Sequence, residues 1–394
     1  MLNEGLTRPK PLRSILQRVQ RPLKLERRPE FDALRGLFLV WMTLTHLPTR
    51  LSDLVNQPFG FLSSAEGFVF LSALLVARLY IRKAAEDEGA LRVKLWKRAL
   101  KIYGYHVVLL MLAFTIVAAF AVHRHKPALM NLLTFYLAHP FTAIVGSLLL
   151  IYTPPLLDIL PMYVIFLLAT PYLLAIAARR GWRPILAGSA TIWMLAQFGL
   201  RNWAHGLIVH VTGLHIPLQE TGAFNLFGWQ IVWVTGMVLG AASAEGPLPL
   251  RRLPAWVFWL SAAICLFFIG VRHDWLGPHL STERFGLLLD KWQIGTLRLV
   301  NLAAFVLVAY WARGLVKRVV LVEPFLTLGK ASLEVFCAHL VFVFVGLALL
   351  YGEVEQLHGW LAALLVGITF AGLFVVAVRD IRKKRLEKAA AAQN

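Results

Sequence analysis

The chain has 394 residues, of which 58% are hydrophobic and only 15% are charged, and its formal net charge is +19. A soluble protein of this length needs far more polar surface, so the composition excludes a soluble enzyme or binding module. The cations are spread over separate loops without a nucleic-acid recognition module, so we expect membrane lipids and not nucleic acid to be their partners. The sequence predicts an all-α polytopic membrane protein.

Apolar runs of roughly 20 residues, the length that crosses a bilayer core, recur along the chain. About ten transmembrane helices are predicted, near 33–49, 59–80, 99–122, 155–178, 184–203, 225–243, 254–271, 294–312, 331–351 and 358–378. The segment 128–152 is also apolar, but His139 and Pro140 interrupt it. We expect a re-entrant or interfacial piece there, with an eleventh span as the alternative.

The distribution of cations predicts the orientation. With ten spans and the N-terminus inside, 28 Lys and Arg residues fall on inside segments and 7 on outside segments. This bias follows the positive-inside rule, so both termini are expected to be cytoplasmic. The chain then divides into a basic N-terminal segment over 1–31, a membrane domain over 32–379 and a basic tail over 380–394. The apolar residues of the N-terminal segment recur at helical spacing, which suits an interfacial helix.

The first span, DALRGLFLVWMTLTHLP, carries Arg35 and His46 with ten residues between them. Eleven residues of helix advance about 16 Å and return to nearly the same direction, so the two side chains share one face. Titratable groups inside a membrane helix are costly and usually face a cavity. The pair predicts a site that a substrate enters from one side of the membrane and that carries out proton chemistry near the other.

The second span begins with Ser63, Ser64 and Glu66. Because this span runs antiparallel to the first, Glu66 and His46 are expected at a similar depth. A carboxylate there can orient and charge the imidazole of His46. The alternative is that the serines and Glu66 only join helices through hydrogen bonds.

Polar residues also stand at the starts of later spans. Asp158 follows the Pro154–Pro155 stop, where it either caps a helix or binds an acceptor. Trp229 and Gln230 open another span on the same side, and an aromatic ring beside an amide suits the face and hydroxyls of a sugar. Interfacial Trp is common in any membrane protein, which is the alternative.

Two cations lie close together further along the chain: Lys291 precedes a span and Arg298 lies within it. Arg298 and Glu334 are expected to neutralise each other, the usual fate of such charges. We expect no metal site. His123 and His125 have no companion ligands at the right spacing, and the two cysteines lie in separate spans.

Six motifs follow one another from about residue 30 to 345: DALRG followed by His46, GFLSSAEGFVFLS, PPLLDILPMY, FNLFGWQ, DK followed by LR, and LGKASLEVFCAH. With these motifs in register, the chain resembles the OpgC family. Members are ten-span inner-membrane proteins implicated in succinylating osmoregulated periplasmic glucans. They belong with the transmembrane acyltransferases, in which an Arg and a His at this spacing serve acyl-CoA chemistry.

The resemblance implies an acyltransferase of the bacterial inner membrane with no permanently bound cofactor. Acyl-CoA, with succinyl-CoA as the implied donor, docks at the cytoplasmic face and meets Arg35. His46 then acts as general base on a hydroxyl of an envelope glucan or other polysaccharide.

Further roles in that reaction fall to the other polar residues. Glu66 or Asp158 orients the imidazole of His46, and Lys291 or Arg298 holds the oxyanion or the succinyl carboxylate. The competing hypotheses are a carrier or flippase for an anionic lipid or sugar, which the missing internal repeats disfavour, and an inactive scaffold for glycan assembly. The oligomeric state is not predicted.

Overall fold

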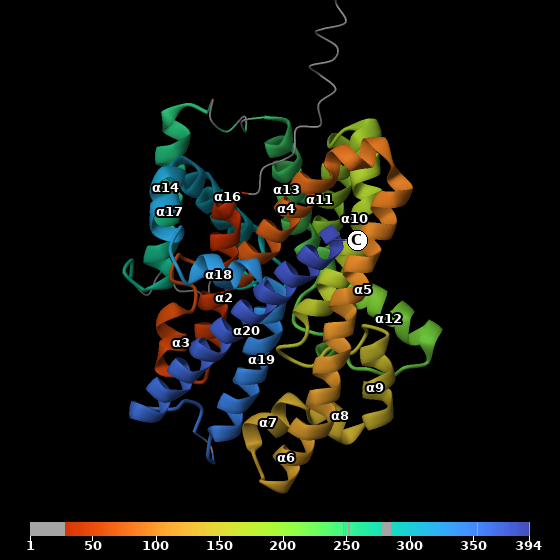
Figure 1. Cartoon of the computed structure of the whole chain (residues 1–394), viewed down its shortest axis with the longest axis vertical. Helices are drawn as coiled ribbons and strands as arrows, with labels where there is room; N and C mark the ends of the chain where they lie inside the picture. The colour runs from red at the N-terminus through yellow and green to blue at the C-terminus, as the bar shows by residue number, and fades with distance from the viewer. Residues whose placement is uncertain are drawn as a thin grey trace, which may run out of the picture.

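The structure is a computed structural model that describes residues 28–246, 248, 250, 253–277, 285–352 and 354–393. It is 80% helical and has no strand in these ranges, which confirms the predicted all-α class (Figure 1). Residues 1–27 of the interfacial helix expected over 1–31 lie outside the described residues.

Within the described residues, seven helices are long and apolar enough to cross a membrane. They are α4 (Ser64–Glu86), α10 (Ile159–Arg180), α13 (Leu226–Glu245), α14 (Ala255–Arg272), α19 (Ser332–Leu349), α20 (Gly359–Gln393) and the continuous run Glu88–His123. That run contains α5 (Glu88–Leu112), the π-helix Ala113–Val117 and α6 (Ala118–His123). An eighth span arises if α16 (Thr296–Trp311) and α17 (Arg313–Val320), which meet at 83°, count as one.

The other predicted spans are also helices, but shorter or more polar. Helix α2 (Pro29–His46) carries three charged residues among its 18, because the polar site begins on it. The span expected over 184–203 is broken at Gly199, which adopts a left-handed conformation between α11 (Arg183–Gln197) and α12 (Leu200–Thr212). The count of ten therefore stays a prediction.

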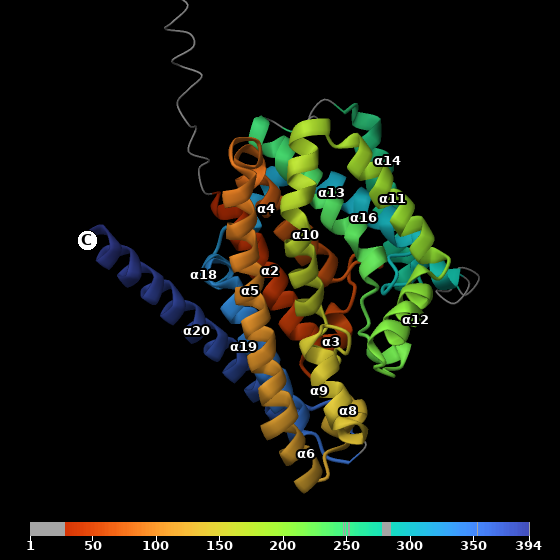
Figure 2. The same ribbon diagram turned by 90° about the vertical axis from the view of Figure 1, so that its right-hand side faces the viewer.

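The segment 128–152 forms three short helices: α7 (Pro127–Leu132), α8 (Thr134–Ala138) and α9 (Pro140–Leu148). The longest has nine residues, too few to cross a bilayer core. They fold back along the end of α6 (Figure 2). The ring of Tyr136 stacks on Phe114 with centroids 4.1 Å apart, and its hydroxyl donates to the Phe114 carbonyl inside the π-helix.

Close helix crossings hold the centre of the bundle. Gly36 of α2 lies directly against the backbone of Phe325 in α18 (Phe325–Lys330), and Gly329 of α18 lies against the backbone of Asp32. A short helix, α3 (Arg50–Val55), follows α2. Small residues let backbones approach closely, so α2 is fixed in position along its first turns.

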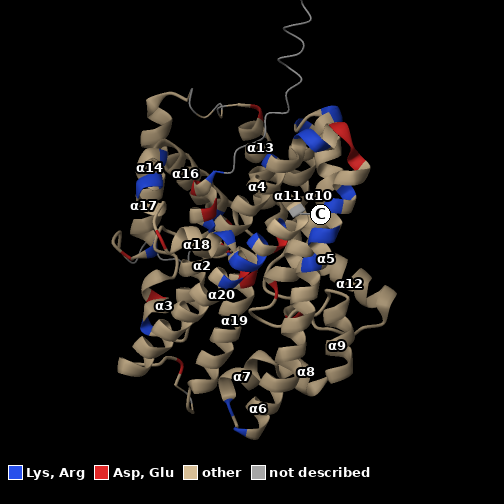
Figure 3. Cartoon of the chain, viewed as in Figure 1, with Lys and Arg blue, Asp and Glu red and all other residues tan. Residues whose placement is uncertain are grey.

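One end of the molecule is strongly basic (Figure 3). Here α4 ends and α5 begins, and α10 ends and α11 begins. Arg179 of α10 forms an ion pair with Glu88 of α5, which brings the two junctions together. We call this the basic end; its cations include Arg82, Lys83, Arg92, Lys94, Lys97, Arg98, Arg179, Arg180 and Arg183. Helix α2 begins near it, because Arg28, the residue before α2, and Arg82 of the basic end both lie near Arg78.

Candidate functional site

Two histidines from distant parts of the sequence meet within the bundle. His46 is the last residue of α2, and His339 lies in the middle of α19. Nδ1 of His46 lies 3.3 Å from Nε2 of His339, and the two rings stack with their centroids 5.6 Å apart. His339 is fully buried, whereas His46 is partly exposed. The pair therefore has an inner member and an accessible member.

The ring nitrogens of the pair are not equivalent. Nδ1 of His339 is hydrogen-bonded to the backbone carbonyl of Phe336, one turn earlier in α19. Both nitrogens of His339 are thus engaged. Nε2 of His46 has no hydrogen-bond partner among the residues that the structure describes. It is the one ring nitrogen of the pair that is available to a substrate.

Glu66 has a different partner from the one that its depth suggested. Its Oε1 lies 2.5 Å from Nε of Arg298, and its Oε2 accepts a hydrogen bond from the backbone N–H of Ser63 at 3.0 Å. The side chains of Glu66 and Arg298 are 1% and 2% exposed. Breaking a buried pair of this kind costs about 3–5 kcal/mol, so this pair holds α4 to α16.

The predicted pairing of Arg298 with Glu334 is wrong. Glu334 lies 2.9 Å from Nζ of Lys101 in α5 and 3.4 Å from Nζ of Lys384 in α20. The two side chains lie at different heights in the bundle. Glu334 lies in the first turn of α19, beside α5. Arg298 lies beside the first turn of α4, and it is the opposite end of α4 that leads into α5.

Asp158 precedes α10 and is buried. Its side chain makes no capping bond to that helix; instead Oδ2 accepts a hydrogen bond from the backbone N–H of Ala223 at 3.0 Å. Asp158 therefore occupies the N-cap position of α10 but makes no side-chain capping hydrogen bond there. The carboxylate fixes the segment that leads into α13.

Lys291 belongs to the loop between Gly286–Leu289, a 3₁₀ turn, and α16. Its charge is within interaction range of His46, Glu66, Asp158 and Arg298. Burial lowers the pKa of the Lys291 ammonium and Arg298 lowers it further, whereas Glu66 and Asp158 act in the opposite direction. Lys291 thus lies within charge range both of His46 and of the polar residues Glu66, Asp158 and Arg298.

Trp229 and Gln230 support this loop and its neighbours. Trp229 is fully buried, and its Nε1–H donates to the carbonyl of Trp292, 3.1 Å away. Nε2 of Gln230 donates to the carbonyl of Ser189 in α11, and its Oε1 accepts from the Ser189 hydroxyl. The polar atoms of both side chains are therefore bonded to the protein.

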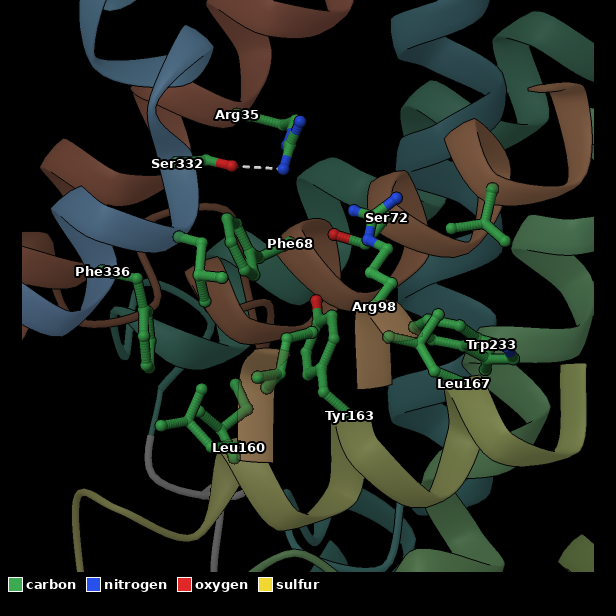
Figure 4. A pocket seen from close by; sticks show the side chains of 14 residues that line it. Arg35, Phe68, Ser72, Arg98, Leu160, Tyr163, Leu167, Trp233, Ser332 and Phe336 are labelled. Atoms are coloured by element: carbon green, nitrogen blue, oxygen red, sulfur yellow. Dashed lines mark hydrogen bonds between the residues drawn. The ribbon is translucent and has the colours of Figure 1, made fainter. Parts of the chain in front are cut away.

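Arg35 lines a cavity of about 60 Å³ between α2, α4, α5, α10 and α19 (Figure 4). Its Nη2 donates to the hydroxyl of Ser332 at the start of α19. Arg98 and the hydroxyl-bearing residues Ser72 and Tyr163 line the same space. The cavity therefore combines two guanidinium groups with hydroxyl groups inside an otherwise apolar wall.

Aromatic rings connect the cavity wall to the histidine pair. Phe68 and Phe336 both line the cavity, and their rings stack with centroids 6.1 Å apart. Phe336 also meets His339 edge-on, at 4.9 Å between centroids. The ring of Phe336 therefore contacts both the cavity wall and the histidine pair.

Several of these residues were not among the predicted site residues. His339 falls in the span predicted over 331–351 but had no predicted role, and neither did Arg98, Ser72, Tyr163 or Ser332. The usable signal was a histidine inside an apolar span, which rarely occurs without a polar partner. For the serines and Tyr163 no such signal exists, because hydroxyl groups are common in membrane helices.

Fold and site together define a multi-pass helical membrane protein with a polar site built inside its helix bundle. Residues 27–385 match the family described as OpgC protein, and the chain belongs to that family. No curated protein and no solved structure matches the chain. The family consists of membrane proteins of the glucan-modifying acyltransferase type, and membership implies a transferase role.

Proposed function

We propose that this protein is an O-acyltransferase of the bacterial inner membrane. It transfers a succinyl group from cytoplasmic succinyl-CoA to a hydroxyl of a periplasmic glucan. The observation that carries the proposal is the arrangement on α2. Arg35 lines a cavity there, and His46 has one ring nitrogen without a hydrogen-bond partner among the described residues. Eleven residues of helix separate them by about 16 Å, comparable with the extended arm of the donor.

The donor enters from the basic end. The positive-inside rule places this end in the cytoplasm, where its cations meet the phosphates of the nucleotide. Arg35 and Arg98 then face the entering arm in the cavity. The apolar wall that runs from Phe68 to Phe336 guides the thioester toward His46.

The reaction needs a base and a cation near the thioester. Nε2 of His46 accepts the proton of the glucan hydroxyl as its oxygen attacks the thioester carbon. Lys291 stabilises the resulting oxyanion. When the intermediate collapses, the C–S bond breaks and the CoA sulfur takes the proton from His46, which restores the neutral imidazole and releases CoA and the succinyl ester.

The remaining polar residues support these groups. Arg298 is compensated by Glu66, which is why Lys291 is the better candidate for the oxyanion. Asp158 lies within charge range of Lys291 and orients it. Trp229 holds the carbonyl of Trp292, next to Lys291, so its role is to position the loop, while Gln230 fixes α13 against α11.

A transfer assay with the purified protein tests the proposal. Succinyl-CoA labelled in the succinyl group is incubated with periplasmic glucan, and label on the glucan is counted. His46→Ala should lower the turnover about 10²- to 10⁴-fold, the contribution of a general base. His123→Ala, which removes an exposed histidine at the end of α6, is the matched control and should behave as wild type.

Folded His46→Ala protein with wild-type turnover would contradict the assignment of the base. Transport of unmodified glucan or lipid into vesicles without any labelled product would identify a carrier instead.

A further inference from the structure

A histidine that acts as a base needs a partner for its second nitrogen. A neutral imidazole carries its proton on either Nδ1 or Nε2, and only the unprotonated nitrogen accepts a proton. In the acyltransferase proposed above, the reacting atom is Nε2 of His46, so Nδ1 must carry the proton and must donate it to an acceptor. Carboxylates commonly take this role.

The nearby carboxylates are engaged elsewhere. Glu66 contacts Arg298 and Ser63, and the Oδ2 atom of Asp158 accepts from Ala223. The atom that faces Nδ1 of His46 is Nε2 of His339, at 3.3 Å. His339 therefore stands where a carboxylate would be expected.

The hydrogen bonds determine the tautomer of both rings. The Phe336 carbonyl can only accept, so Nδ1 of His339 carries a proton and donates it to that carbonyl. Neutral His339 then has a lone pair on Nε2, which accepts the Nδ1–H of His46. That assignment leaves the lone pair of His46 on Nε2, the nitrogen without a partner in the described part of the chain.

We propose that His339 is a positioning residue, which fixes the tautomer and the ring orientation of His46 from behind through the chain Phe336 carbonyl, His339, His46. The proposal rests on the acyltransferase function proposed above. The proton on Nδ1 of His46 stays there during the reaction. As His46 takes the hydroxyl proton and becomes charged, the bond to Nε2 of His339 strengthens.

A neutral acceptor suits this position. Both rings lie in a helix bundle where His339 is fully buried, and an unpaired carboxylate there would be costly. Among the residues described, no group of three or more His, Cys, Asp and Glu side chains could hold a metal ion, so a shared metal does not explain the contact.

The test compares two substitutions at position 339 in the labelled-succinyl assay. His339→Leu removes the acceptor at similar volume and should lower kcat about 10- to 100-fold, the usual effect of losing such a supporting partner, without changing KM for succinyl-CoA. His339→Gln offers its Oε1 atom to Nδ1 of His46 and should recover most of that loss. His106→Leu, at another fully buried histidine, is the matched control and should keep the wild-type kcat per folded molecule.

A wild-type kcat in folded His339→Leu would overturn the proposal. So would equal impairment of the Leu and Gln variants, because that result indicates packing alone. The double variant His46→Ala/His339→Leu should be no slower than His46→Ala, since His339 acts through His46. If His46→Ala is itself fully active, the proposed base fails; if it is inactive while His339→Leu is normal, only the role of His339 fails.

Discussion

Lys291 and Arg298 lie near the same site but differ in their partners. Arg298 contacts a carboxylate directly, whereas Lys291 has no ion pair within the described ranges. A compensated guanidinium contributes little to an incoming anion. The ammonium of Lys291, held in range of His46, is the charge that remains available.

The lowered pKa of Lys291 makes a prediction about alkaline pH. Because burial favours the neutral amine, Lys291 loses its charge at a lower pH than an ordinary lysine does. Activity should therefore decline as the pH rises toward that pKa. Lys291→Arg keeps its charge and should move the decline to higher pH, whereas Lys291→Met should be slow at every pH.

The measurement is the rate of transfer from neutral to alkaline pH, corrected for thioester hydrolysis without enzyme. If Lys291→Met and wild type lose activity over the same pH range with equal rates below it, another group is responsible.

Residue positions could be predicted where they depend on one helix. The spacing of Arg35 and His46 put them on one face because the helix period is known. The contact between His46 and His339 joins residues 293 positions apart, and no local pattern specifies which helices meet. Glu66 illustrates the same limit: its helix could be predicted, but its partner Arg298, in place of His46, depends on how α16 packs against α4.

At the scale of elements, the close crossing of α4 and α13 fixes the helix on which Glu66 lies. Gly236 and Gly240 of α13 lie against the backbone carbonyls of Phe70 and Leu74 in α4. A Cβ atom on Gly240 would lie 2.1 Å from the Leu74 oxygen, so no rotamer change relieves the clash. Since Glu66 lies in the first turn of α4, this crossing contributes to the position of the buried ion pair between Glu66 and Arg298.

Gly240→Ala should therefore lower the thermal stability of the purified protein and its activity together. Gly188→Ala is the matched control, because a Cβ there meets nothing within 4 Å on α11. In that helix interior, replacing glycine should be neutral or stabilising by about 0.5–1 kcal/mol. The two melting curves decide: equal midpoints would show that the α4–α13 crossing tolerates separation.

Hydrophobic length predicted the helices well and their ends less well. Each of the ten predicted runs falls on a helix, but the break at Gly199 and the three short helices after α6 depend on packing. His139 and Pro140 did signal that 128–152 is interrupted, and Pro140 begins α9. In the described part of the chain seven or eight helices meet the requirements for a span; α2 does not, because the polar site makes it less apolar.

At the scale of the whole molecule, charge and site are arranged along one axis. Cations gather at the basic end, and the long helix α20 runs from the opposite end back toward it (Figures 1 and 3). Arg35 lies nearer the basic end and His46 farther from it, because α2 begins there. The proposed reaction uses this axis: donor from one side, acceptor from the other.

A sided transfer assay tests this claim most directly. The protein is reconstituted into sealed vesicles, the fraction with each orientation is measured by protease access to the basic tail, and glucan is enclosed before labelled succinyl-CoA is added outside. Label should reach enclosed glucan only through molecules whose basic end faces outward, and His46→Ala should abolish it. Transfer only when donor and glucan share one side, or transfer that persists in His46→Ala, would contradict the account.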